Sequence, residues 1–207
     1  MALAVAAELK VKAGVGAEFE KLFRTLDEYV QTREPGTLFY QLCKKDDETY
    51  IVLEVYENQA AVDAHSNSAL YKEFFKKSGR FLAGKPEFIV CSTVGNDGRK
   101  DISGASVAVL AHLEMQRGKG KQFESIFQDL SESVHSKEPD CLYYQLCRHQ
   151  SNPDSFSAFE LYKDRKALMR HSKTSHFSAA SAKFAPLLNA KPKIVTMQPV
   201  GALQSKL

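Results

Sequence analysis

The 207-residue chain has no tryptophan, only four cysteines and no long apolar run. No hydrophobic stretch approaches the roughly 18 residues that a bilayer-spanning helix needs, so no membrane partner is expected. The cysteines form no CxxC pair, which argues against a zinc site or a redox dithiol and fits a reducing compartment. The basic residues form no dense stripe, so the net charge of +3 does not indicate a nucleic-acid partner.

Phosphate-binding loops and clustered metal ligands are also missing. The glycine pairs at 14–16 and 118–120 do not match the nucleotide-binding fingerprints. The histidines are spread over several elements without a standard ligand spacing, and no carboxylates cluster with them. We therefore expect neither a metal nor another cofactor.

The same sequence pattern occurs twice in the chain. Glu34-Pro35 is repeated 104 residues later as Glu138-Pro139, and His65 is repeated 106 residues later as His171. Further matches join Val5–Leu9 to Val109–Leu113, Leu38–Cys43 to Leu142–Cys147, and Glu54–Tyr56 to Glu160–Tyr162. Because internal repeats define the architecture, the chain is predicted to hold two units, at residues 1–95 and 105–201. A linker at 96–104 joins them, and a tail at 202–207 follows.

Each repeat has the hydrophobic pattern of a β-α-β-β-α-β unit. Residues 3–12 alternate between apolar and polar, which predicts a strand. Apolar residues then follow at helical spacing from Phe19 to Val30, and Glu34-Pro35-Gly36 ends this helix. The remaining predicted elements are strands at 37–44 and 49–56, helical segments at 58–65 and 68–82, and a last strand at 87–94.

This order of elements predicts an α+β fold with two ferredoxin-like repeats. A single unit would leave one face of its antiparallel sheet open. That face would carry either Tyr40 and Val52 or, on the opposite parity, Phe39 and Ile51. Either face is too apolar to be exposed to solvent, so the two sheets are predicted to pack together within the chain.

Three motifs recur in both repeats. The first repeat reads Glu34-Pro35-Gly36-Thr37-Leu38-Phe39-Tyr40, Glu54-Val55-Tyr56 and Asp63-Ala64-His65. The second repeat reads Glu138-Pro139-Asp140-Cys141-Leu142-Tyr143-Tyr144, Glu160-Leu161-Tyr162 and Met169-Arg170-His171. These motifs resemble the antibiotic biosynthesis monooxygenase (ABM) domain of the dimeric α/β-barrel superfamily. The resemblance covers nearly all of both halves and implies an intramolecular dimeric α/β barrel.

The resemblance implies several possible activities. The family includes cofactor-free oxygenases of quinols and polycyclic phenols, haem-degrading enzymes and isomerases of small hydroxyketones, and some members have no known activity. The haem-degrading branch typically has a tryptophan in its pocket, and this chain has none. That absence argues against haem degradation.

Two histidines of the second repeat are the main catalytic candidates, His171 and His176. On one continuous helix their imidazoles would lie about 140° apart. Thr174 has the pattern of an N-cap, so the helix is predicted to break there and both rings can turn inward. A neutral imidazole can act as a general base near pH 7. Since the first repeat has Leu70 in place of His176, the second repeat is predicted to be the active one.

Two strand residues are further candidates in the second repeat. His112 replaces Glu8 of the first repeat, and Glu160 precedes Tyr162. A histidine and a carboxylate in one cleft could form a base and its orienting partner. The structural alternative is that the shared histidines cap helix ends and that the shared glutamates accept hydrogen bonds from a tyrosine hydroxyl or a helix N-terminus.

Four residues are predicted to bind substrate in a dry apolar pocket: Tyr144, Phe177, Phe184 and Leu187. For Tyr144 the alternative is a core aromatic residue with a polar tip.

The favoured hypothesis is a cofactor-independent, monooxygenase-like enzyme acting on a small quinol, phenolic or enolisable substrate. An isomerase of a small hydroxyketone and a non-catalytic ligand-binding or structural barrel are the alternatives. Catalysis predicts that His112, His171 and His176 converge in one cavity, whereas a binding or structural role predicts scattered imidazoles.

The last three residues, Ser205-Lys206-Leu207, have the sequence of a peroxisomal address. They predict a location in the peroxisomal matrix and an import receptor as a partner. In a host without peroxisomes the tripeptide would be a coincidence and the location cytosolic. Pairing of two such chains into a homodimer is left open.

Overall fold

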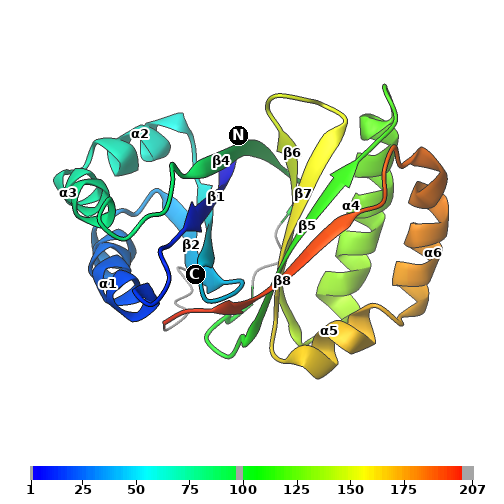
Figure 1. Cartoon of the computed structure of the whole chain (residues 1–207). Coiled ribbons are helices and arrows are strands. Elements are labelled where there is room, and N and C mark those ends of the chain that lie inside the picture. The colour runs from blue at the N-terminus through cyan, green and yellow to red at the C-terminus, as the bar shows by residue number, and fades with distance from the viewer. Residues whose placement is uncertain (1, 97–99, 202–207) are drawn as a thin grey trace. The chain divides into compact units, whose positions relative to one another are not determined.

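The computed structural model describes residues 2–96 and 100–201. The first repeat consists of β1 (Leu3–Lys10), α1 (Gly16–Arg33), β2 (Thr37–Lys44), β3 (Thr49–Tyr56), α2 (Gln59–Asn67), α3 (Ala69–Ser78) and β4 (Glu87–Val94). The second consists of β5 (Val107–Glu114), α4 (Gly120–Lys137), β6 (Cys141–His149), β7 (Ser155–Tyr162), α5 (Arg165–His171), α6 (Ser175–Phe184), the 3-10 turn η1 (Ala185–Leu187) and β8 (Lys193–Pro199) (Figure 1). The α+β class and the two ferredoxin-like repeats are confirmed.

The strands pair in the antiparallel order β1-β3-β2-β8-β5-β7-β6-β4, the strand order of a closed barrel, in agreement with the predicted fold class. The chain divides into two compact units, residues 2–90 with 198–201, and Cys91–Met197. Both boundaries fall inside strands. Cys91–Val94 of β4 pair with β6, whereas the last two residues of β8 pair with β2. Each unit therefore takes part of its sheet from the end of the other repeat.

In the first unit, α1 and α3 lie side by side (Figure 1). Helix α1 buries an apolar stripe that includes Phe19 and Phe23. On the strands, the alternation of side chains places Tyr40 and Val52 in the same core cluster as this stripe.

The second unit repeats this arrangement, with α4 and α6 side by side (Figure 1). Helix α4 buries Phe123 and Phe127 among its stripe. Helices α5 and α6 are separate, because Thr174 is the N-cap of α6 and its hydroxyl accepts the backbone N–H of Phe177 at 3.2 Å. The predicted helix break is confirmed.

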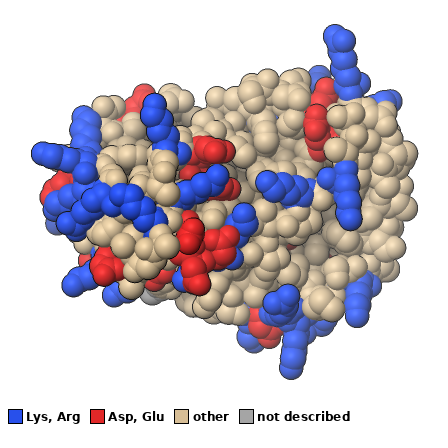
Figure 2. All heavy atoms as spheres, viewed as in Figure 1, with Lys and Arg blue, Asp and Glu red and all other residues tan. Residues whose placement is uncertain are grey.

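Charged side chains of both signs are interspersed over the helices of the first unit on the face drawn in Figure 2. The face of the second unit in the same view carries fewer of them. Among the described residues, no helix combines the length and apolar character that crossing a membrane requires. Ser205-Lys206-Leu207 lie outside the described residues, so the peroxisomal address stays a prediction.

Candidate active site

A cavity of about 380 Å³ lies in the second unit, between the sheet and its helices. Five residues predicted from the sequence line it: His171, Glu160, Tyr144, Phe177 and Phe184. The other lining residues are Val109, Ala111, Leu113, Phe127, Leu130, Ala158, Leu168, Ser172, Ser181, Lys191, Pro192 and Ile194. The walls are thus largely apolar and aromatic, as is usual for pockets that bind small organic molecules.

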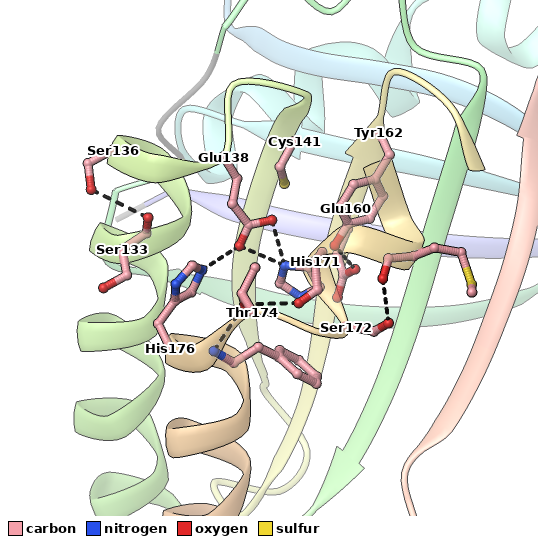
Figure 3. Close-up of polar contacts among 12 residues, drawn as sticks. Ser133, Ser136, Glu138, Cys141, Glu160, Tyr162, His171, Ser172, Thr174 and His176 are labelled. Atoms are coloured by element: carbon pink, nitrogen blue, oxygen red, sulfur yellow. Dashed lines mark hydrogen bonds and ion pairs between the residues drawn. The ribbon is translucent and has the colours of Figure 1, made fainter. Parts of the chain in front are cut away.

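A carboxylate and two imidazoles meet beside this cavity (Figure 3). Nδ1 of His171 lies 3.0 Å from Oε2 of Glu138, and Nε2 of His176 lies 2.6 Å from its Oε1. The three residues come from different elements: Glu138 follows α4, His171 ends α5, and His176 lies in the first turn of α6. The break between α5 and α6 therefore allows both histidines to face the same carboxylate.

The backbone of Glu138 is fixed by its place at the end of α4. Its N–H donates to Val134 O at the helix C-cap, and Pro139 prevents the helix from continuing. The ammonium group of Lys100, from the segment between the repeats, donates to the carbonyl oxygens of Glu138 at 2.7 Å and of Cys141 at 2.9 Å. A cation here also complements the negative end of the helix dipole.

Glu138 is held in its ionised form. Burial would raise the pKa of Glu138, but hydrogen bonds to His171 and His176, together with their charges, outweigh burial and lower that pKa. An ionised carboxylate only accepts hydrogen bonds, so the facing Nδ1 of His171 carries a proton. In neutral His171 the basic lone pair is then on Nε2, on a ring that lines the cavity.

A second carboxyl group lines the same cavity. Glu160 accepts a hydrogen bond from the Tyr162 hydroxyl at 2.8 Å, which is the structural role considered for it from the sequence. Burial raises the pKa of Glu160, and this outweighs the lowering by the charge of His171 and the Tyr162 hydrogen bond. Glu160 therefore keeps its proton to higher pH than an exposed carboxyl group.

Tyr144 stacks on Phe127 with ring centroids 5.1 Å apart and an interplanar angle of 7°. Its ring also lies 5.3 Å from that of His171. Burial, with the nearby charge of Glu160, raises the pKa of Tyr144 well above its usual value, so its hydroxyl stays protonated. Tyr144 is thus both the core aromatic residue and a cavity wall.

The three histidines do not all converge. His112 bonds through Nδ1 to Ser157 Oγ at 3.1 Å, and His149 bonds to the same hydroxyl at 2.9 Å. Strand alternation places this group on the sheet face opposite Ala111 and Ala158, which line the cavity. His176 does not line the cavity but bonds Glu138, which in turn holds His171, and Leu187 packs in the core cluster and not on the cavity wall.

The orienting carboxylate, Glu138, was not predicted from the sequence. Its Glu-Pro dipeptide, present in both repeats, was interpreted as a helix stop, although the same recurrence could have marked Glu138 as a partner of His171. Ser172, the C-cap of α5, and the half-buried Ser181 were also missed, and nothing in the sequence pattern distinguishes them from the other serines of this region. Among the described residues, no group of three histidine, cysteine, aspartate or glutamate side chains is arranged to hold a metal ion.

The chain is similar to known proteins in sequence and in structure. It is 28% identical over 108 residues to an uncharacterized protein of Synechocystis, a match that covers 51% of this chain and 72% of that protein. A candidate monooxygenase of Fusobacterium nucleatum has a TM-score of 0.87 at 18% identity, with 100% of this chain and 96% of that chain covered. One from Lactobacillus acidophilus has a TM-score of 0.84 at 17% identity, covering 99% and 97%. At such identities the two structures show a shared fold.

The family profile of antibiotic biosynthesis monooxygenase matches residues 2–77 and again residues 106–183. The two matches together span most of the chain and coincide with the two sequence repeats. The resemblance first seen in the Glu-Pro, Glu-x-Tyr and histidine motifs is therefore confirmed, and the chain belongs to the antibiotic biosynthesis monooxygenase family.

Proposed function

We propose that the second unit is a cofactor-independent monooxygenase acting on a small phenolic, quinol or enolisable substrate. The observation that carries the proposal is the cavity of about 380 Å³, whose apolar walls enclose an imidazole held by the ionised Glu138. A base, an orienting carboxylate and a water-poor chamber are the parts that such a reaction requires.

His171 is the proposed base. Its Nε2 removes a proton from an activated carbon or a phenol, and the imidazolium that forms is stabilised by Glu138. The substrate anion then transfers electrons to O2 and forms a carbon–oxygen bond. Return of the proton gives a hydroperoxide, which loses water and leaves a carbonyl group. An activated CH2 group and O2 are thus converted to C=O and H2O, with the substrate as the electron donor.

Two other polar groups of the cavity suit this sequence of steps. The raised pKa of Glu160 keeps its carboxyl protonated at higher pH, and a protonated carboxyl can donate a hydrogen bond to a substrate oxygen. Tyr144 is a second donor for the same purpose. His176 lies outside the cavity wall, and its proposed role is to hold Glu138 in place.

Oxygen uptake by the purified, chelator-treated protein tests the proposal against a panel of quinols and hydroxylated polycyclic aromatics. We expect His171→Ala to lower the rate by about 10²–10⁴-fold, the usual contribution of a general base. The matched control is His65→Ala, because His65 makes the equivalent bond to Glu34 in the first unit. This control is expected to leave the rate unchanged.

The proposal fails if His171→Ala retains full oxygen uptake, or if both variants lose it equally. No uptake with any substrate, together with exchange of substrate protons in D2O that depends on His171, would indicate the isomerase. Binding without turnover or exchange would indicate a ligand-binding protein.

A further inference from the structure

The first unit contains the same polar groups as the candidate active site, in nearly the same geometry. His65 Nδ1 lies 2.7 Å from Glu34 Oε2, where the second unit has His171 and Glu138 at 3.0 Å. The Tyr56 hydroxyl donates to Glu54 at 2.7 Å, matching the bond of 2.8 Å to Glu160 in the second unit.

The aromatic walls also match. Phe23 stacks on Tyr40 at 5.6 Å and 8°, and the equivalent pair, Phe127 and Tyr144, stacks at 5.1 Å and 7°. The units therefore share the dyad, the buried glutamate and the stacked pair that border the cavity in the second unit.

The units differ in the aromatic residues of the last helix. Helix α3 has Phe74 and Ser78, whereas α6 has Ala180 and Phe184 at the equivalent places. The ring has moved by four residues, which is about one helical turn. At the neighbouring position, Phe75 of the first unit corresponds to Ser181 on the cavity wall.

This shift changes what covers the stacked pair. In the first unit the ring of Phe74 packs edge-on against Phe23 at 5.6 Å and 88°, and Phe74 is only 5% exposed. In the second unit Phe184 packs against Phe123 at 5.6 Å, while Phe127 and Phe184 both border the open cavity. Phe74 therefore packs on Phe23, whose counterpart Phe127 is cavity wall in the second unit.

A buried nitrogen in the first unit points to a ligand position. His65 is only 3% exposed, and its Nε2 has no hydrogen-bond partner among the described residues. An unpaired buried polar atom is costly and calls for a specific explanation. It is the atom equivalent to Nε2 of His171, the proposed base.

We infer that the first unit holds a second ligand site of the same kind, closed by the ring of Phe74, and that the aromatic position on α3 and α6 decides which site is open. Once the ring is moved away, the ligand admitted is a small, largely apolar molecule with a hydroxyl group that hydrogen-bonds His65 Nε2. Its chemistry rests on the proposed function, whereas the closure rests on the packing alone.

Two volume-conserving exchanges test this inference. Phe74→Ala with Ser78→Phe moves the ring to the place it has in the second unit and leaves Phe75 unchanged, and Ala180→Phe with Phe184→Ser does the reverse and leaves Ser181 unchanged. Xenon binding in crystals under xenon pressure detects open apolar cavities regardless of ligand chemistry.

We expect xenon in the second unit of the unmodified chain, in both units after the first exchange, and in neither unit after the second exchange. Calorimetry with 2-naphthol should give stoichiometries of one, two and zero.

Xenon beside His65 in the unmodified chain would overturn the inference, as would an empty first unit after the opening exchange. Xenon retained in the second unit after the closing exchange would do the same. The unaltered unit of each variant serves as the folding control, and Phe74→Leu, a smaller change at the same position, replaces the opening variant if that one does not fold. If xenon binds as expected but 2-naphthol binds to no variant, the proposed phenolic substrate class is wrong, whereas the inferred closure of the first unit by Phe74 is retained.

Discussion

Glu138 is the residue that gives the two histidines of the second repeat a common function. Without it, His171 and His176 would be two imidazoles on separate helices. Its carboxylate fixes the proton of His171 on Nδ1 and bonds to His176 at the same time. Because Lys100 bonds the carbonyl of Glu138, the segment between the repeats also helps to position the site.

The His112 group makes a pH-dependent contribution to stability. Burial, with the nearby charges of His149 and Lys193, lowers the pKa of His112 to about 4. An unfolded imidazole takes up its proton near pH 6.5, so between these values the unfolded chain binds more protons. The free energy of unfolding therefore falls as the pH is lowered from about 6.5 to 4. Since His112 is partly exposed, we expect a loss on the order of 1 kcal/mol.

Urea unfolding at pH 7 and pH 5 measures this contribution. In His112→Gln the amide can still bond Ser157 but does not titrate, so the difference between the two pH values should shrink by about that amount. An unchanged difference would show that His112 is not responsible.

His171, Tyr144 and Phe177 were predicted as site residues from the helix break at Thr174 and from the resemblance to the ABM domain, and all three line the cavity. The sequence could not predict which carboxylate hydrogen-bonds each histidine. Glu138 and Glu160 are both carboxylates near His171, and only tertiary packing decides which of them reaches its Nδ1. His112 was expected in the same cavity because strand alternation alone does not show which sheet face the helices cover.

At the level of elements, the break between α5 and α6 is a local feature with a functional consequence. We expect Thr174→Ala to lower the free energy of unfolding by about 1 kcal/mol, because the backbone N–H of Phe177 loses its cap. His176 lies two residues away, so the rate of substrate turnover should fall as well. Chemical denaturation and oxygen uptake measure the two effects.

Ser68 is the matched control, since its hydroxyl caps α3 by accepting the N–H of Tyr71 at 3.2 Å. Ser68→Ala should lower stability by a similar amount but leave turnover unchanged. Equal losses of activity in both variants would mean that general destabilisation, and not the position of His176, accounts for the effect.

This break could be predicted because an N-cap depends on residues next to one another in sequence. The sequence also contains the difference in ring position, with Phe74 in the first repeat and Phe184, four residues further along, in the second. No local sequence pattern marks this difference. Both helices keep an amphipathic pattern with either arrangement, so its effect is visible only in the packing, where Phe74 contacts Phe23 as well as Phe19 and Phe184 contacts Phe123.

At the scale of the whole molecule, the compact units do not coincide with the sequence repeats. The predicted boundaries at 95 and 105 follow the duplication, whereas the compact units are divided inside β4 and β8. Strands that pair can be far apart in sequence, so a sequence repeat does not show with which unit's sheet the last strand of that repeat pairs. Here β4 contributes Cys91–Val94 to the sheet of the second unit.

This sharing of strands can be tested with fragments. Residues 91–197 keep the pairing of β4 with β6 and the bond from the Gln145 side chain to Val94 O at 2.9 Å. Residues 95–197 keep Lys100 but lose those four strand residues. Several hydrogen bonds and the buried Cys91 are then lost, and the β6 edge is exposed. We expect the shorter fragment to be less stable by about 2–4 kcal/mol, at about 1 kcal/mol per bond, and to self-associate.

Thermal unfolding and sedimentation velocity compare the two fragments, and because both contain Lys100, a difference between them arises from residues 91–94. Equal stability of the fragments would mean that β4 adds nothing to the second unit and that the duplication alone defines its domains. A less stable, self-associating shorter fragment would mean that the second unit depends on a strand encoded in the first repeat. Separation of the two repeats would then remove part of the sheet that supports the candidate active site.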